Sequence, residues 1–72
     1  RLIIINKNEP GMISKLTALL ASLDLNISDM TNKSRDKIAI NLIDLEFEAR
    51  TELIEQLRSI DHVLTVRSVN AG

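Results

Sequence analysis

The sequence contains no cysteine, tryptophan or tyrosine, and one phenylalanine among its 72 residues. Without cysteine there is neither a disulfide framework nor a thiolate metal site, and we expect a cytoplasmic protein. With so few aromatic side chains, a sheet surface cannot stack nucleotide bases. The apolar residues are instead aliphatic, with 11 leucines, 10 isoleucines and 3 valines. The core must therefore form from interlocking aliphatic side chains.

An excess of charge of one sign is also missing, because the sequence has 9 basic and 10 acidic residues. The basic residues are scattered along the chain. This pattern lacks the electrostatic footprint of non-specific nucleic-acid binding. No uninterrupted apolar run is longer than Leu2 to Ile5, which is too short to span a bilayer or to form a signal peptide. We therefore expect neither a nucleic-acid partner nor a membrane partner.

The length indicates one domain, residues 1–72, that buries only about 60% of the surface of its unfolded chain. A partner surface, either a second copy or a larger protein, would help to stabilise so small a core. The chain begins at Arg1 rather than at an initiator methionine, so we expect it to be a piece of something longer.

Apolar periodicity predicts the order strand, helix, strand, strand, helix, strand. We expect strands at residues 1–6, 26–33, 37–48 and 63–69, and helices from 12 to 23 or 24 and from 51 to 59. Pro10 is typical of a first helical position, and Thr51 is a plausible N-cap of the second helix. The predicted buried stripes are Met12, Ile13, Leu16, Leu19, Leu20 and Leu23 in the first helix, and Leu53, Ile54, Leu57 and Ile60 in the second.

Two strand-helix-strand units with right-handed crossovers predict an α+β fold, the ferredoxin-like βαββαβ plait. This fold is a four-stranded antiparallel sheet with both helices on one face. Its first and third strands are central, and the corresponding runs here are apolar on both faces, as central strands are. The strand at 26–33 has few apolar residues, so we expect it at an edge, where it could pair with another chain.

A polar corner, residues 6–11, joins the first strand to the first helix and reads Asn-Lys-Asn-Glu-Pro-Gly. A helix N-terminus carries free N–H groups and partial positive charge. With the bare backbone of Gly11 and the amides of Asn6 and Asn8 beside it, such a corner can hold a small anionic or zwitterionic ligand. The alternative is an ordinary strand-to-helix turn, since Asn, Pro and Gly are common turn residues.

No catalytic or metal-binding constellation is visible in the sequence. The single histidine, His62, falls at a predicted helix-to-strand turn without a triad-like arrangement around it. The first loop has neither the cysteine pair of a copper chaperone nor an arginine cradle for phosphate. Binding is the chemistry that remains, and the corner is its best local candidate.

The sequence resembles the ACT domain family of small-molecule regulatory modules. The resemblance is carried by residues 5–13, 25–27 and 63–67, which read Ile-Asn-Lys-Asn-Glu-Pro-Gly-Met-Ile, Leu-Asn-Ile and Val-Leu-Thr-Val-Arg. Residues 32–35, Asn-Lys-Ser-Arg, and 43–46, Ile-Asp-Leu-Glu, make it similar more narrowly to the regulatory domains of bacterial D-3-phosphoglycerate dehydrogenases. The resemblance covers essentially the whole chain and implies that residues 1–72 are the C-terminal part of a longer enzyme.

The resemblance implies that two copies pair side by side through the first helix and the second strand, with an amino acid effector, L-serine, at their interface. The implied effector site joins the first loop of one copy to Asn26 of the other. Serine-sensing relatives carry a histidine at the position of Asn6. The expected effector-binding residues are Asn6, Asn8, Pro10, Gly11, Met12 and Asn26. The domain itself is expected to need no cofactor and no metal, while NAD is expected in a catalytic part outside this chain.

Two other classes of function stay open at this point. The chain could be an ACT module of another amino-acid enzyme or of a transcription regulator. It could also be a purely oligomerising module, in which the corner is only a turn and the edge strand makes the contact. Catalysis by the 72 residues alone is the least expected of the functions considered.

Overall fold

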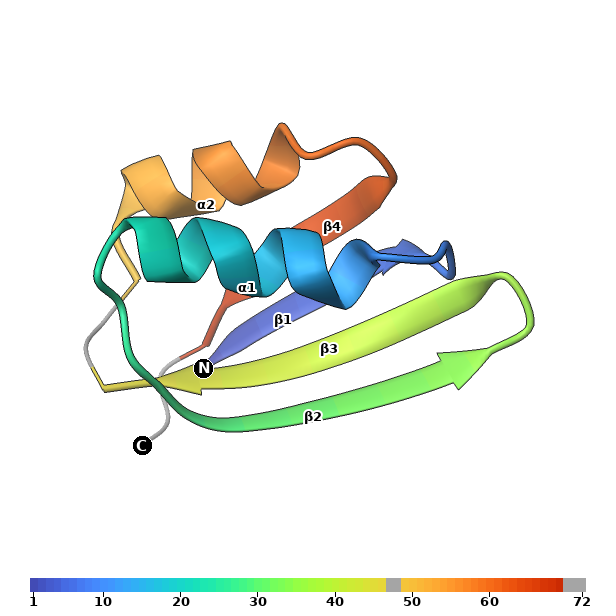
Figure 1. Ribbon diagram of the computed structural model, residues 1–72, viewed down its shortest axis with the longest axis horizontal. Helices are drawn as coiled ribbons and strands as arrows, with labels where there is room; N and C mark the ends of the chain where they lie inside the picture. Colours follow the sequence, from blue (N-terminus) through green and yellow to red (C-terminus); the bar gives the residue numbers. More distant parts are fainter. Residues whose placement is uncertain (47–48, 70–72) are drawn as a thin grey trace.

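The computed structural model describes residues 1–46 and 49–69, which form four strands and two helices in the predicted order. The elements are β1 (Leu2–Lys7), α1 (Met12–Ser22), β2 (Ile27–Arg35), β3 (Ile38–Leu45), α2 (Thr51–Arg58) and β4 (Val63–Ser68). The strands pair antiparallel in the order β2-β3-β1-β4, and both helices cover the same face of the sheet (Figure 1). The predicted ferredoxin-like plait is therefore confirmed. Within this described part, neither helix is long and apolar enough to cross a membrane.

The core lies between the sheet and the two helices. Along β1, Leu2, Ile4 and Asn6 are buried, while Ile3 and Ile5 on the opposite face are half-buried. This alternation follows from the two-residue period of a strand. The central positions of β1 and β3, and the edge position of β2, agree with the prediction. The buried cluster consists of Leu2, Ile4, Leu16, Leu20, Ile43, Leu53, Leu57 and Val66.

Local backbone chemistry fixes both ends of α1. The helix begins at Met12, with Gly11 as N-cap in the left-handed region at φ 82°. Pro10 therefore lies in the turn before the helix, and its expected place as first helical residue is wrong. At the other end, Asp24 has φ 56°, its N–H donates to the Ala21 carbonyl at 3.0 Å, and the Leu25 N–H donates to the Leu20 carbonyl at 3.0 Å. This pairing is a Schellman motif, which stops the helix and directs the chain into β2.

Several predicted side-chain positions need correction. Ile13 and Leu23 were expected in the buried stripe, but they are 44% and 41% exposed. Ile13 lies about 100° round the helix from Met12, beyond the strip that the sheet covers, and Leu23 is the C-cap, where the helix has ended. In the second helix, Leu53 and Leu57 are buried and Ile54 packs against the core as a partly buried neighbour. Ile60 packs there too, but it lies beyond the end of α2.

Some predicted element boundaries also differ. Thr51 is the first residue of α2 rather than its N-cap, which is Arg50, and no side chain caps this end. Strand β2 runs to Arg35, two residues further than predicted, because Ser34 and Arg35 still pair with Ala39 and Ile38 on β3. The predicted end of the third strand, at residues 47–48, lies outside the described residues.

Candidate functional site

The polar corner is held by two turns that lie at the same end of the sheet. The backbone N–H of Asn8 donates to the Lys37 carbonyl at 2.8 Å, and its side-chain Nδ2 donates to the Asp36 carbonyl at 3.1 Å. The N–H of Lys7 donates to the carbonyl of His62 at 2.8 Å, so this histidine, at φ 74°, acts as a turn residue. The loop is therefore fixed to the β2–β3 turn on one side and to the turn before β4 on the other.

A half-open cavity of about 160 Å³ lies beside this loop. Its walls come from the loop, the end of β1, the first turn of α1, the middle of β2 and the start of β3. A cavity of about 150 Å³ can hold benzene, so this one suits a molecule of the size of a small amino acid. The N–H groups of Ile13 and Ser14 belong to the first helical turn and have no carbonyl four residues earlier inside the helix. The cavity is lined by Asn6, Asn8, Glu9, Gly11, Met12, Ile13, Ser14, Asn32 and Ala39.

Three asparagine side chains, which we call the amide relay, link the edge strand to β1, and the two outer members, Asn6 and Asn32, line the cavity. Nδ2 of Asn32 on β2 donates to Oδ1 of Asn41 on β3 at 2.6 Å. Nδ2 of Asn41 donates to Oδ1 of Asn6 on β1 at 2.6 Å, and Nδ2 of Asn6 donates to the Lys7 carbonyl at 2.7 Å. Asn6 and Asn41 are 1% and 0% exposed, so the relay satisfies amides that would otherwise be costly to bury.

The hydrogen bonds decide which polar atoms the cavity presents. The amide nitrogens of Asn8 and Asn32 both donate to protein oxygens, whereas the side-chain oxygens of these two residues accept no hydrogen bond from the described residues. Glu9 adds a carboxylate, and none of the described lining residues is basic. The walls therefore favour a ligand with hydrogen-bond donors or positive charge, while the first turn of α1 can receive a carboxylate.

The predicted site residues lie in two places. Asn6, Asn8, Gly11 and Met12 line the cavity, and Pro10 shapes the turn before the helix. Asn26 lies beyond the opposite end of α1, whose 11 residues make the helix about 16 Å long. There its Nδ2 contacts Oε2 of Glu46 at 3.4 Å. A single chain thus does not bring Asn26 to the other predicted residues.

Sequence reasoning missed the roles of Asn41 and Asn32 in this site. A signal for Asn41 was present, because it occupies the helix-facing position between Ala39 and Ile43 in an otherwise alternating apolar strand. A polar residue at such a position needs a hydrogen-bonding partner. Its partner could not be named without the strand register, which places Asn32 directly opposite Asn41.

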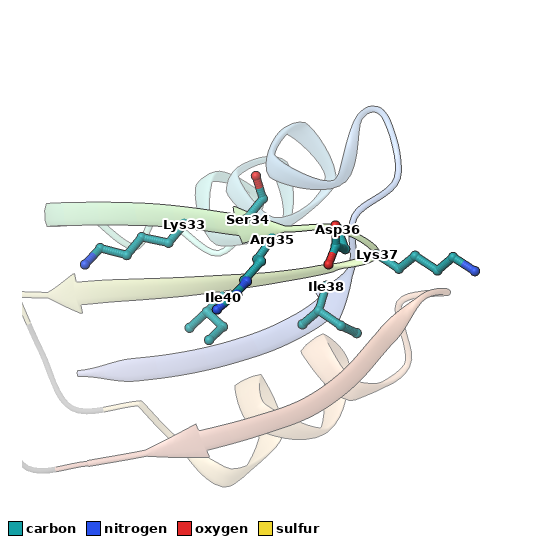
Figure 2. A pocket seen from close by; sticks show the side chains of 7 residues that line it. All are labelled: Lys33, Ser34, Arg35, Asp36, Lys37, Ile38 and Ile40. Atoms are coloured by element: carbon teal, nitrogen blue, oxygen red, sulfur yellow. The ribbon is translucent and has the colours of Figure 1, made fainter.

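A larger hollow of about 1040 Å³ lies at the β2–β3 hairpin. Figure 2 shows Lys33, Arg35, Ile38 and Ile40 on the strands of the hairpin, with Lys37 extending away from its tip. Lys33 lies opposite Ile40 and Arg35 opposite Ile38, so cations flank apolar side chains on the sheet face without helices. This hollow is a broad surface and not an enclosed site, and it lies on the other side of the sheet from the amide relay.

Comparison with known proteins gives both a sequence relative and structural neighbours. No family model matches the chain. D-3-phosphoglycerate dehydrogenase from Haemophilus influenzae (strain ATCC 51907 / DSM 11121 / KW20 / Rd) is 30% identical over 67 residues, which are 93% of this chain. The chain spans only 16% of the length of that relative.

The structural neighbours include two structures of one ACT domain. The crystal structure of the ACT domain from GTP pyrophosphokinase of Chlorobium tepidum matches with a TM-score of 0.71 and 25% identity, covering 94% of this chain and 92% of that one. The solution structure of the same domain matches with a TM-score of 0.76 and 22% identity, covering 94% and 81%. The small subunit of acetolactate synthase from Thermotoga maritima matches with a TM-score of 0.72 and 21% identity, covering 97% and 46%.

Proposed function

This chain has the fold of ACT domains, and we propose that it is the amino-acid-binding regulatory domain of a cytoplasmic D-3-phosphoglycerate dehydrogenase, with L-serine as its effector. The match along 93% of the chain to such a dehydrogenase supports the choice of host. In this proposal the domain is not catalytic, and NAD belongs to a catalytic part outside this chain. Residues 1–72 form one C-terminal regulatory unit of that enzyme.

The observation that carries the proposal is the cavity beside the corner. Its walls combine free N–H groups at the start of α1 with the side-chain oxygens of Asn8 and Asn32. A zwitterion presents a carboxylate and an ammonium group a short distance apart, so it matches this arrangement of donors and acceptors. An anion such as phosphate lacks the positive group and would lie beside the Glu9 carboxylate.

We place the effector between two copies that pair side by side through α1 and β2. The outer edge of β2 has no strand partner among the described residues, and Ile13 on the flank of α1 is 44% exposed. When two copies join their β2 edges to extend the sheet, the twofold axis is perpendicular to α1. The two α1 helices then run antiparallel, and the end of one lies beside the start of the other. This arrangement brings Asn26 of one copy to the cavity of its partner, although a single chain keeps them apart.

Titration with amino acids tests the proposal. Calorimetry and thermal unfolding with L-serine, glycine and L-alanine should give heat and a higher melting temperature for at least L-serine. A ligand at about 100 times its Kd stabilises the bound state by about 2.7 kcal/mol. Asn26→Ala should weaken binding without lowering the stability of the free protein, since Asn26 is exposed. Gln56→Ala, at an exposed position on α2, is the matched control and should bind as the unmodified chain does.

Two results would count against the proposal. Absence of both heat and thermal shift for every amino acid at millimolar concentration would leave the corner as an ordinary turn. Sedimentation then separates the remaining functions, because a dimer that forms regardless of amino acids would favour a purely oligomerising module. Binding of another amino acid in preference to L-serine would keep the regulatory role and change the host enzyme.

A further inference from the structure

We propose that Asn32 is a specificity residue of the effector site, whose side-chain oxygen accepts a hydrogen bond from the ammonium group of the bound amino acid. The inference rests on the proposed function, since it assigns one more residue to the same cavity. Asn32 lies on the edge strand β2, is exposed, and lines the cavity together with residues of the first turn of α1. It would contact the effector directly.

The amide relay sets the orientation of the Asn32 side chain. An asparagine amide can turn either its oxygen or its nitrogen toward a neighbour, but a backbone carbonyl can only accept a hydrogen bond. Because Nδ2 of Asn6 donates to the Lys7 carbonyl, Oδ1 of Asn6 is left to accept from Asn41. The Asn41 oxygen is then left to accept from Asn32. The Lys7 carbonyl therefore fixes which way every amide in the relay is turned. At the outer end of the relay, the Asn32 oxygen is the acceptor that is left over.

The charges around the cavity indicate which group of the effector forms a hydrogen bond with the side-chain oxygen of Asn32. An amide oxygen repels a carboxylate and attracts an ammonium group, and the acidic residue Glu9 is among those that line the same cavity. Lys33, the neighbouring cation on β2, lies opposite Ile40 on the other face of the sheet. The ammonium group is thus expected at the β2 side of the cavity and the carboxylate at the start of α1.

A comparison of two ligands isolates this contact. L-serine and 3-hydroxypropanoate differ in that the second carries hydrogen in place of the amino group. The unmodified chain should bind L-serine more tightly, and Asn32→Leu should reduce the affinity for L-serine about tenfold or more, as expected for a lost hydrogen bond to a charged group. The affinity for 3-hydroxypropanoate should stay nearly unchanged, so the ratio of the two affinities falls. Thr31→Val, the exposed neighbour on the opposite face of β2, is the matched control and should keep the ratio.

The outcomes separate this inference from the proposed function. If the unmodified chain binds no amino acid, both fail. If it binds L-serine and Asn32→Leu keeps the ratio of affinities, the assignment of Asn32 is wrong while the regulatory function stands. An equal loss for both ligands would also overturn the assignment, because it would indicate a general distortion of the cavity. Asn32→Asp removes the Nδ2 donor to Asn41 but keeps an acceptor at this position, so it should retain the preference for L-serine even if the variant is less stable.

Discussion

Among the residues that the structure describes, Asn6 and Asn41 are the two buried polar ones in an otherwise apolar core, and they bury their amides almost completely. Such burial is tolerated because each amide both donates and accepts a hydrogen bond inside the protein. The sequence indicated that Asn6 belongs to the site, yet both of its polar atoms already have protein partners. Its direct contact with an effector stays a prediction, while its structural role in the amide relay follows from the hydrogen bonds.

A double-mutant cycle measures the interaction between these two amides. Asn41→Leu leaves the buried oxygen of Asn6 without its donor, and an unsatisfied buried group costs about 1–3 kcal/mol of unfolding free energy. Asn6→Leu likewise removes the acceptor of Asn41. The double variant should lose less than the sum of the single losses, since no unpaired amide remains between them. Urea unfolding monitored by circular dichroism gives the four unfolding free energies, those of the unmodified chain, the two single variants and the double variant.

The control for this cycle pairs Asn41→Leu with Thr65→Val, which lies on β4 at an exposed position of the sheet. That pair should be additive within about 0.5 kcal/mol, because the two sites share no partner. Strict additivity for the Asn6 and Asn41 pair as well would contradict a relay in which the two amides depend on each other.

At the scale of elements, features that depend on a short stretch of sequence could be predicted, whereas features that depend on how elements pack or pair could not. The order of elements, the two central strands and a helix beginning at Met12 followed from apolar periodicity, whereas the place of Pro10 as first helical residue did not hold. The exposure of Ile13 did not follow from this periodicity, because the width of the buried stripe depends on how much of the helix the sheet covers. The part that Asn32 plays depends on strand register, which one sequence read alone does not supply.

The start of α1 depends on the backbone of Gly11. This residue has φ 82°, where a side chain strains the backbone, and an added Cβ would meet no atom within 4 Å. Gly11→Ala should therefore lower stability through the backbone alone, by about 1–2 kcal/mol. A loss of 1 kcal/mol corresponds to about 4–8 °C in the melting temperature of a domain of this size. Differential scanning calorimetry measures the shift.

Gly11→Asn is the control, because asparagine adopts the left-handed region more readily than alanine does. It should cost less than Gly11→Ala although its side chain is larger. Equal losses for both variants would point to a steric contact of the loop and would contradict the backbone explanation.

At the scale of the whole molecule, the small core leaves little stability in reserve. For 72 residues, the free energy of unfolding is expected to be about 4–11 kcal/mol. The central side chains come from every strand except the edge strand β2 and from both helices, so one substitution affects the entire fold. The β2 edge and the flank of α1 are the surfaces by which a second copy would add to this stability.

Leu20→Ala tests how closely stability depends on this core. Leu20 is 0% exposed at the centre of the cluster, and truncation of such a leucine costs about 2–5 kcal/mol. The loss is a large part of the total, so the variant should be near its unfolding midpoint at a moderate temperature. Leu23→Ala, at the 41% exposed C-cap of the same helix, should cost about 0.5 kcal/mol or less. Thermal unfolding of both variants at low protein concentration gives the comparison.

The same variant reports on pairing between copies. Dimerisation stabilises the folded state by mass action, so the melting temperature of Leu20→Ala should rise as protein concentration is raised about a hundredfold, and rise further with L-serine. A monomer gives a melting temperature that does not depend on concentration. A constant value in the absence of L-serine and a concentration-dependent value in its presence would mean that the effector itself joins the two copies. A melting temperature that does not depend on protein concentration under both conditions would contradict the paired site. Without pairing, Asn26 cannot lie beside the cavity that Asn8 lines.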